Sequence, residues 1–173
     1  RTFQPHVITD DSALGGSFVE GSLRFDGSGD HFIRTPSSEG NRRRFTISLW
    51  CKRSLTGVYQ AFIGPWADNG NRDTFRIDDN DRLEFQSTGN SANAKSTARF
   101  RDTKSWYHFM VVADATRTST TDRVKFYANG ELLSQSENSY TSSNIQFKYN
   151  DNVSHYLAAR GISGSNNLDW NGY

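Results

Sequence analysis

The feature that most constrains this fold is a series of short runs in which apolar and polar residues alternate. Helical periodicity is hard to find over any window of about 11 residues. The alternating runs recur between clusters of Gly, Asn, Asp and Ser, which is the pattern of β-strands joined by turns. In the clearest run, residues 45–52, one face carries Phe45, Ile47, Leu49 and Cys51. The sequence therefore predicts an all-β protein, with Cys51 in its core.

The turn chemistry indicates antiparallel pairing. Asn129-Gly130 separates two apolar runs, and both central residues of a type I′ hairpin turn need a positive φ. Residues 106–113 are apolar on both faces, which is typical of a central strand. About a dozen short strands without crossover helices predict two antiparallel sheets in a sandwich or jelly roll.

Length and charge limit the kind of protein. A chain of 173 residues suits one domain, and we expect the sandwich to span residues 22–173 after an N-terminal arm or linker, residues 1–21. With 20 Lys and Arg against 19 Asp and Glu, the net charge of +1 gathers neither nucleic acid nor an anionic membrane. No apolar stretch approaches the roughly 20 residues of a membrane span. We expect no nucleic-acid or membrane partner.

Cys51 is the single cysteine of the chain. It allows no internal disulfide and no zinc site built from cysteine pairs, so synthesis in a reducing cytoplasm is expected. The chain begins with Arg1 and carries no signal-peptide pattern at its start, so we expect a fragment or a processed product.

Several segments together resemble a known family. They read SLRFDG at residues 22–27, FTISLWCK at 45–52, WYHFMVV at 106–112 and VKFYANGEL at 124–132. Their order and spacing are similar to the laminin-G-like branch of the concanavalin A-like lectin/glucanase superfamily, over residues 22–173. The resemblance implies a jelly roll of two curved antiparallel sheets. It also implies a last strand after the segment LDWNGY, residues 168–173, so we expect that strand to be missing, or supplied by following sequence or a neighbouring chain.

The composition of the chain resembles that of modules in bacteriophage virion proteins, particularly tail fibres and other appendages. It is rich in Ser, Asn and Asp, lacks disulfides and reads HYLAARG at residues 155–161. The resemblance implies a non-enzymatic virion module, made in the host cytoplasm and otherwise extracellular, that makes assembly contacts or binds host-surface glycan. Its partners would be other virion proteins and host polysaccharide, in a trimeric or other homo-oligomer. The alternatives are a polysaccharide-degrading glycoside hydrolase and a purely structural capsid or tail decoration.

Catalytic groups are sparse. Glucanases of the superfamily carry an E-x-D-x-x-E pattern, and Asp79, Asp81 and Glu84 reproduce its spacing with Asp at the first position. Because Asp79 and Asp81 lie at the apex of a predicted hairpin, we interpret them as part of a solvated turn. The histidines are scattered at positions 6, 31, 108 and 155, and we expect His108 to be a hydrogen-bonded core residue. No catalytic residue is predicted.

Calcium is a candidate cofactor. Laminin-G-like domains often bind it through Asp and Asn oxygens at one rim of the sandwich, and two loops here are rich in oxygen ligands. Neither loop, residues 68–73 or residues 78–81, fits the EF-hand pattern, and ordinary turns would have the same composition. The candidate metal ligands are Asp73, Asp78, Asp79 and Asp81.

An aromatic platform beside amide and carboxylate groups is typical of sugar recognition, because a pyranose has an apolar face ringed by hydroxyls. Trp66 lies next to such groups, and the candidate ligand-binding residues are Trp66, Asp68, Asn69 and Asn71. Packing in the core is the alternative for Trp66. Trp170, which has similar neighbours, is expected to pack against the missing last strand.

Overall fold

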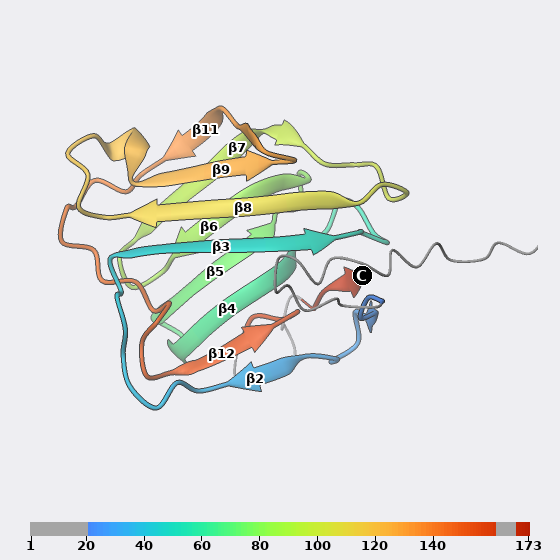
Figure 1. Cartoon of the computed structure of the whole chain (residues 1–173), viewed down its shortest axis with the longest axis horizontal. Coiled ribbons are helices and arrows are strands. Elements are labelled where there is room, and N and C mark those ends of the chain that lie inside the picture. The colour runs from blue at the N-terminus through green and yellow to red at the C-terminus, as the bar shows by residue number, and fades with distance from the viewer. Residues whose placement is uncertain (1–20, 162–168) are drawn as a thin grey trace, which may run out of the picture.

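The computed structural model describes residues 21–161 and 169–173, which form a β-sandwich (Figure 1). The predicted N-terminal arm, residues 1–21, lies outside the described residues except for Gly21. A 3₁₀ turn, η2, precedes β9 and spans Thr120–Asp122. No helix within the described ranges is long and apolar enough to cross a membrane. The strands are β1 (Phe25–Asp26), β2 (Phe32–Arg34), β3 (Arg44–Cys51), β4 (Gln60–Asp68), β5 (Asn71–Ile77), β6 (Arg82–Ser87), β7 (Ala92–Arg99), β8 (Tyr107–Asp114), β9 (Val124–Ala128), β10 (Glu131–Leu132), β11 (Gln135–Asn138), β12 (Ser154–Leu157) and β13 (Asn171–Gly172).

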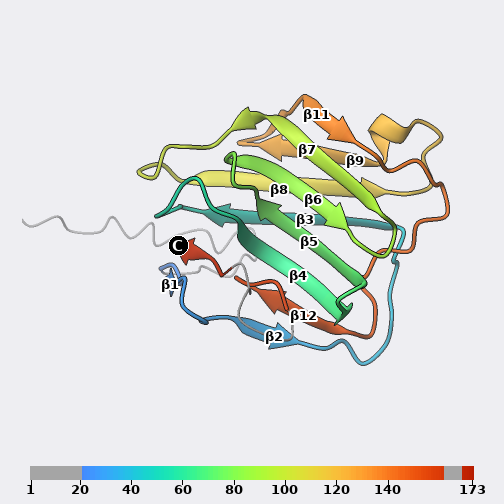
Figure 2. The same ribbon diagram turned by 180° about the vertical axis from the view of Figure 1, so that it is seen from behind.

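Two large sheets form the sandwich. The seven-stranded sheet has the order β11-β7-β6-β5-β4-β12-β2, and the four-stranded sheet has the order β10-β9-β8-β3. Every strand pair is antiparallel. The four-stranded sheet lies in front of the larger sheet in Figure 1 and behind it in Figure 2. The predicted all-β, two-sheet architecture is confirmed.

The local patterns behave as the sequence predicts. Cys51 is buried and Phe45 packs against the core, whereas Trp50, from the opposite face of β3, is 65% exposed. Strand β8 is central, between β3 and β9. Asn129 and Gly130 both have positive φ values, 51° and 88°, and connect β9 to β10.

Aromatic rings fill the space between the sheets. Phe75 and Phe85 from the larger sheet and Phe109 and Phe126 from the smaller one are fully buried. Phe75 and Phe126 stack across the interface with their ring centroids 6.3 Å apart. Deleting a ring in such a position costs about 3–5 kcal/mol, so these contacts hold the two sheets together.

The prediction that His108 lies in the core is wrong. His108 is half-buried on the outer face of the four-stranded sheet, where its ring centroid lies 5.1 Å from that of Trp50. Its Nε2 atom is 2.7 Å from Ser48 Oγ, so the expected hydrogen bond is present. Since residues 106–113 are apolar on both faces, periodicity alone could not say which face points inward.

The last described residues pair with the start of the sandwich. Strand β13 pairs with β1, and Lys52 and Tyr173 exchange two backbone hydrogen bonds of 2.8 Å. Gly172 has φ of 146°, and a Cβ atom there would lie 2.1 Å from the carbonyl oxygen of Lys52, so glycine permits this close approach.

The remainder of this β3 edge has no partner strand in the described part of the chain. Beside it lies an apolar cavity of about 540 Å³, whose lining includes Leu23, Leu49, Phe62 and Leu157. A strand in the register of the Lys52–Tyr173 pair would run along this edge. The expected additional strand stays a prediction.

Candidate functional site

The outer face of the seven-stranded sheet gathers polar side chains over several strands, and it faces the viewer in Figure 2. Because Phe75 and Phe85 point into the core, their neighbours in sequence point outward. The strand register then places outward-pointing residues side by side, in the pairs Trp66–Arg72, Thr74–Gln86, Arg76–Glu84 and Glu84–Lys95. We call this surface the outer face.

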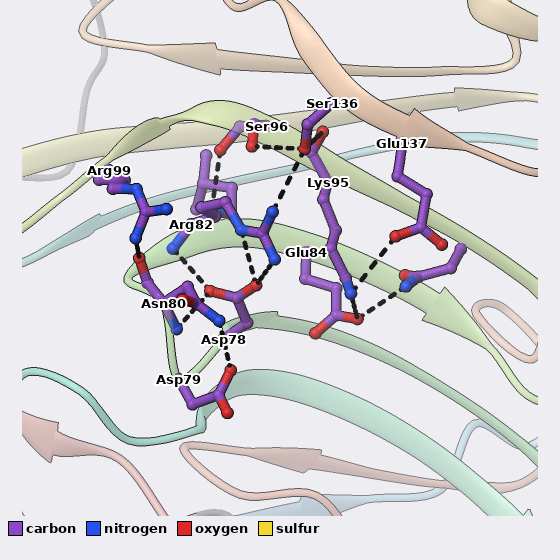
Figure 3. Close-up of polar contacts among 12 residues, drawn as sticks. Asp78, Asp79, Asn80, Arg82, Glu84, Lys95, Ser96, Arg99, Ser136 and Glu137 are labelled. Atoms are coloured by element: carbon purple, nitrogen blue, oxygen red, sulfur yellow. Dashed lines mark hydrogen bonds and ion pairs between the residues drawn. The ribbon is translucent and has the colours of Figure 1, made fainter.

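Glu84 is the buried acid of the outer face, with an exposed fraction of 1%. Its carboxylate lies 2.6 Å from Arg76 Nε and 3.6 Å from Lys95 Nζ, and it accepts a 2.8 Å hydrogen bond from Asn93. Lys95 also pairs with Glu137 at 3.3 Å (Figure 3). The negative charge of Glu84 is therefore compensated within the network.

Arg76 is held on two sides. Its guanidinium carbon lies 4.6 Å from the centre of the Tyr59 ring, and its Nε atom pairs with Glu84. A guanidinium stacked on an aromatic ring and paired with a carboxylate has little freedom to move. Arg76 is thus a fixed positive charge below the surface.

Several hydrogen-bonding groups of the outer face are buried without a partner. Three of them belong to neighbouring positions of β4 and β5, and they are Trp66 Nε1, Arg72 Nε and Thr74 Oγ1, while Asn93 Oδ1 on β7 is an unpartnered acceptor. Thr74 itself is 1% exposed. An unsatisfied buried polar group costs about 1–3 kcal/mol, so an acceptor that reached the three donors would be stabilised there.

A further arginine reaches the same region from the segment after β12. A Cβ atom on Gly64 would lie 3.3 Å from the Cα atom of Arg160, so the chain at Arg160 passes directly over this glycine. Burial lowers the pKa of Arg160 to about 10, and the positive charges of Arg72 and Arg76 act in the same direction. The three arginines therefore share one electrostatic environment.

The sequence-predicted ligand residues divide between two roles. Trp66 is half-buried on the outer face, as a sugar platform requires. Asp68, Asn69 and Asn71 form the exposed β4–β5 turn, where Asp68 Oδ1 accepts hydrogen bonds from the backbone of Gly70 (2.8 Å) and Asn71 (2.9 Å). A hydrogen bond from the Asn71 side chain lowers the pKa of Asp68. The structure uses Asp68 to hold the turn, and a ligand role for these residues stays a prediction.

The structure does not bring the four predicted metal ligands together. Asp73 is buried and accepts a 2.6 Å hydrogen bond from Ser87, while burial raises its pKa to about 6. Asp78 pairs with Arg82 at 2.7 Å, and Asp79 is exposed and accepts a hydrogen bond from Asn80 (Figure 3). Asp81 pairs with Arg53. Among residues 21–161 and 169–173, no three His, Cys, Asp or Glu side chains are grouped as metal ligands, and calcium binding stays a prediction.

The carboxylates with glucanase-like spacing also lie in separate networks. Asp81 pairs with Arg53 at 2.9 Å and Arg101 at 3.0 Å, whereas Glu84 pairs with Arg76 and Lys95. Burial opposes ionisation of Asp81, but hydrogen bonds from the Gly57 amide and both arginines outweigh it and lower its pKa. A carboxyl held ionised in this way is a poor proton donor.

Sequence reasoning missed Arg72, Thr74, Arg76 and Tyr59. One signal was available, since residues 72, 74 and 76 alternate with the core-facing Phe75 and Ile77 and must share the opposite face. The contribution of Arg160 depends on a chain reversal that no local pattern records.

The two antiparallel sheets define the fold class as a jelly-roll sandwich. Residues 26–173 match the laminin-G-like model of the concanavalin A-like lectin/glucanases superfamily, and the chain belongs to this family. No curated protein sequence matches the chain.

Several solved structures share the fold. The CBM40 module of Ruminococcus gnavus IT-sialidase superposes with a TM-score of 0.58 at 15% identity, covering 82% of this chain and 86% of that one. The native heptameric SAP-like pentraxin of Limulus polyphemus gives 0.58 at 14% identity, covering 86% and 70%. Domains LG4-5 of the mouse laminin alpha1 chain give 0.55 at 14% identity, covering 86% of this chain, which spans 38% of the laminin chain.

Proposed function

We propose that this chain is a non-enzymatic adhesion module of a bacteriophage particle, located in a tail fibre or another appendage, that binds a glycan of the host surface through its outer face. The single observation that carries glycan binding is the set of unpartnered groups beside an aromatic residue, Trp66 Nε1, Arg72 Nε and Thr74 Oγ1. A sugar offers hydroxyl acceptors to such groups and an apolar ring face to the indole.

Structural relatives support a binding role. The CBM40 module of R. gnavus IT-sialidase, which shares the fold, is described in complexes with α2,3- and α2,6-sialyllactose. Asp81 and Glu84, the carboxylates with glucanase-like spacing, are bound by different arginines, which does not favour the hydrolase alternative at these two residues.

The composition of the sequence supports the location in a particle, because it is rich in Ser, Asn and Asp and has one cysteine, which is buried. Fibre modules occur in several copies, so a symmetric homo-oligomer would present several outer faces together. Multivalent binding raises the effective affinity of weak single sites by about 10²–10⁴-fold. Other virion proteins would be the assembly partners.

Binding to an array of bacterial surface polysaccharides and oligosaccharides tests the adhesion role. We expect at least one glycan to bind, and Trp66→Ala to weaken that binding about tenfold or more, since stacking and the indole donor are both lost. Trp50→Ala, which removes an exposed tryptophan from the other sheet, is the matched control. Unchanged binding in the Trp66 variant would place the site elsewhere.

The particle location needs a separate experiment. In electron micrographs, antibodies against the folded module should label the appendages of particles of the phage that encodes this chain. Particles that contain no such polypeptide by mass spectrometry would refute the virion role without touching glycan binding.

A further inference from the structure

We infer that the glycan recognised at the outer face is acidic, and that a carboxylate of one sugar residue binds between Trp66, Arg72 and Thr74. This inference rests on the proposed glycan-binding function and names the chemical class of its ligand. Three properties of this part of the sheet support it, namely its unpartnered hydrogen-bond donors, the positive charge of its arginines and the burial of its side chains.

The unpartnered groups are matched to an acceptor. An indole N–H and a guanidinium N–H can only donate, and a threonine hydroxyl can donate as well. An ionised carboxylate only accepts, through two oxygens with about four lone-pair sites. Neighbouring strand positions place these donors on one patch, since Trp66 pairs across the strands with Arg72, and Thr74 is the next outward residue of β5.

The charge of the outer face points the same way. Glu84 pairs with both Arg76 and Lys95, and Glu137 pairs with Lys95. Among the described residues no carboxylate forms an ion pair with Arg72, so this network does not compensate the positive charge of Arg72. Hydrogen bonds between a guanidinium and a carboxylate are roughly twice as strong as those between neutral groups, so an anion gains more here than a neutral sugar.

The pKa of Arg160 falls because of burial, and the positive charges of Arg72 and Arg76 lower it further. Like charges held together in the folded protein repel one another, and a bound anion would relieve this repulsion.

Aromatic residues lie around the patch. The Tyr59 ring supports Arg76 from one side, and on β12 the Tyr156 ring packs against the backbone of Gly161. Tyr156 points outward beside Gly64, so it lies one strand away from Thr74.

Matched pairs of oligosaccharides test the inference by titration calorimetry on the intact chain. The pairs are 3′-sialyllactose with lactose, and trigalacturonate with its methyl ester, which differ in the acidic group. We expect at least one acidic member to bind about tenfold or more tightly than its neutral partner, since hydrogen bonds to a charged group are stronger than those to a neutral group. Higher salt should reduce this difference.

Two variants assign the site. Thr74→Val should weaken acidic-glycan binding about fivefold and leave the melting temperature unchanged or higher, because it removes a buried hydroxyl that has no partner in the free protein. Arg72→Gln should weaken it about tenfold. Thr46→Val and Arg44→Gln make the same changes at exposed positions of β3 and should have no effect.

The outcomes separate the two proposals. If glycans bind but neutral partners bind equally well, or if Arg72→Gln and Thr74→Val match their controls, the acidic-glycan inference is wrong and the adhesion proposal stands. If neither the array nor these pairs yield any binding, both are overturned.

Discussion

Arg53 and Asp81 form an ion pair inside the protein, with Arg53 Nη1 2.9 Å from Asp81 Oδ1 and side chains 0% and 5% exposed. Asp81 also accepts a 2.9 Å hydrogen bond from the Gly57 amide, and Arg53 donates to the carbonyl of Phe100. The pair therefore ties the β5–β6 turn to the segments that follow β3 and β7. Asp81 has φ of 65°, a conformation that Asp and Asn tolerate better than most residues.

Asp81→Asn should cost about 3 kcal/mol of unfolding free energy, because it leaves the Arg53 charge buried without its counter-charge. Asparagine keeps the shape and tolerates the backbone conformation, so the loss reports the charge. Urea unfolding measures it. Asp79→Asn, two residues away and exposed, is the control and should stay within about 0.5 kcal/mol of the wild type. Equal stabilities for the two variants would show that the ion pair contributes nothing.

The pH dependence of stability should contain a contribution from Asp73. Burial raises its folded-state pKa to about 6 from an ordinary value of 3.8, so the folded protein holds a proton that the unfolded chain has lost between these values. Stability attributable to Asp73 is then fully present below about pH 4, falls as the pH rises to about 6 and is constant above it. A shift of this size corresponds to roughly 3 kcal/mol.

Asp73→Asn tests this contribution, because the variant cannot titrate. The difference in unfolding free energy between wild type and variant should change in favour of the variant between pH 4 and pH 7. Urea unfolding at half-unit pH intervals measures the difference. Curves that run parallel over this range would contradict the shifted pKa, whatever the absolute cost of the substitution.

Cys51 should be unreactive in the folded protein. Its side chain is 3% exposed, and burial raises the pKa of its thiol to about 12, although the positive charge of Arg53 acts in the opposite direction. Only the thiolate reacts with disulfide reagents, so labelling with Ellman's reagent at pH 8 should be roughly 100-fold slower in the native state than in guanidinium chloride. Fast native labelling would show that this part of β3 opens readily.

Local patterns in the sequence predict the strands well but the site only in part. Residues 45–52 and the Asn129-Gly130 turn follow from alternation and turn chemistry, which depend on neighbours in sequence. The outer face depends instead on pairing between distant segments. Register shifts between Ala61 and Ile63, and between Trp66 and Asp68, interrupt the alternation of β4.

The position of β12 between β4 and β2 is a second feature that local sequence patterns cannot predict. It brings Tyr156 beside Gly64 and lets the chain at Arg160 return over the sheet. Trp66 could therefore be identified as a candidate from the polar residues near it in the sequence. Arg72, its neighbour across the strands, could be identified only from the strand register.

The close contact at Gly172 gives the last prediction. Gly172 and Gly130 both have φ values in the left-handed range, 146° and 88°, but they differ in surroundings. A Cβ atom on Gly172 would lie 2.1 Å from the Lys52 carbonyl oxygen, whereas one on Gly130 would meet no atom within 4 Å. Gly130→Ala should therefore cost only the backbone strain of about 1–2 kcal/mol.

Gly172→Ala must carry the same strain and also displace the backbone that pairs with Lys52 and Arg53. We expect urea unfolding to show a loss at least about 2 kcal/mol larger than for Gly130→Ala. Hydrogen exchange of the Lys52 and Tyr173 amides should accelerate in this variant alone, since these amides donate across the β13 contact. Equal losses of stability in the two variants, with unchanged exchange rates, would show that β13 is not held against the end of β3 in solution. The unpaired edge of β3 would then include the residues that contact Gly172 and Tyr173.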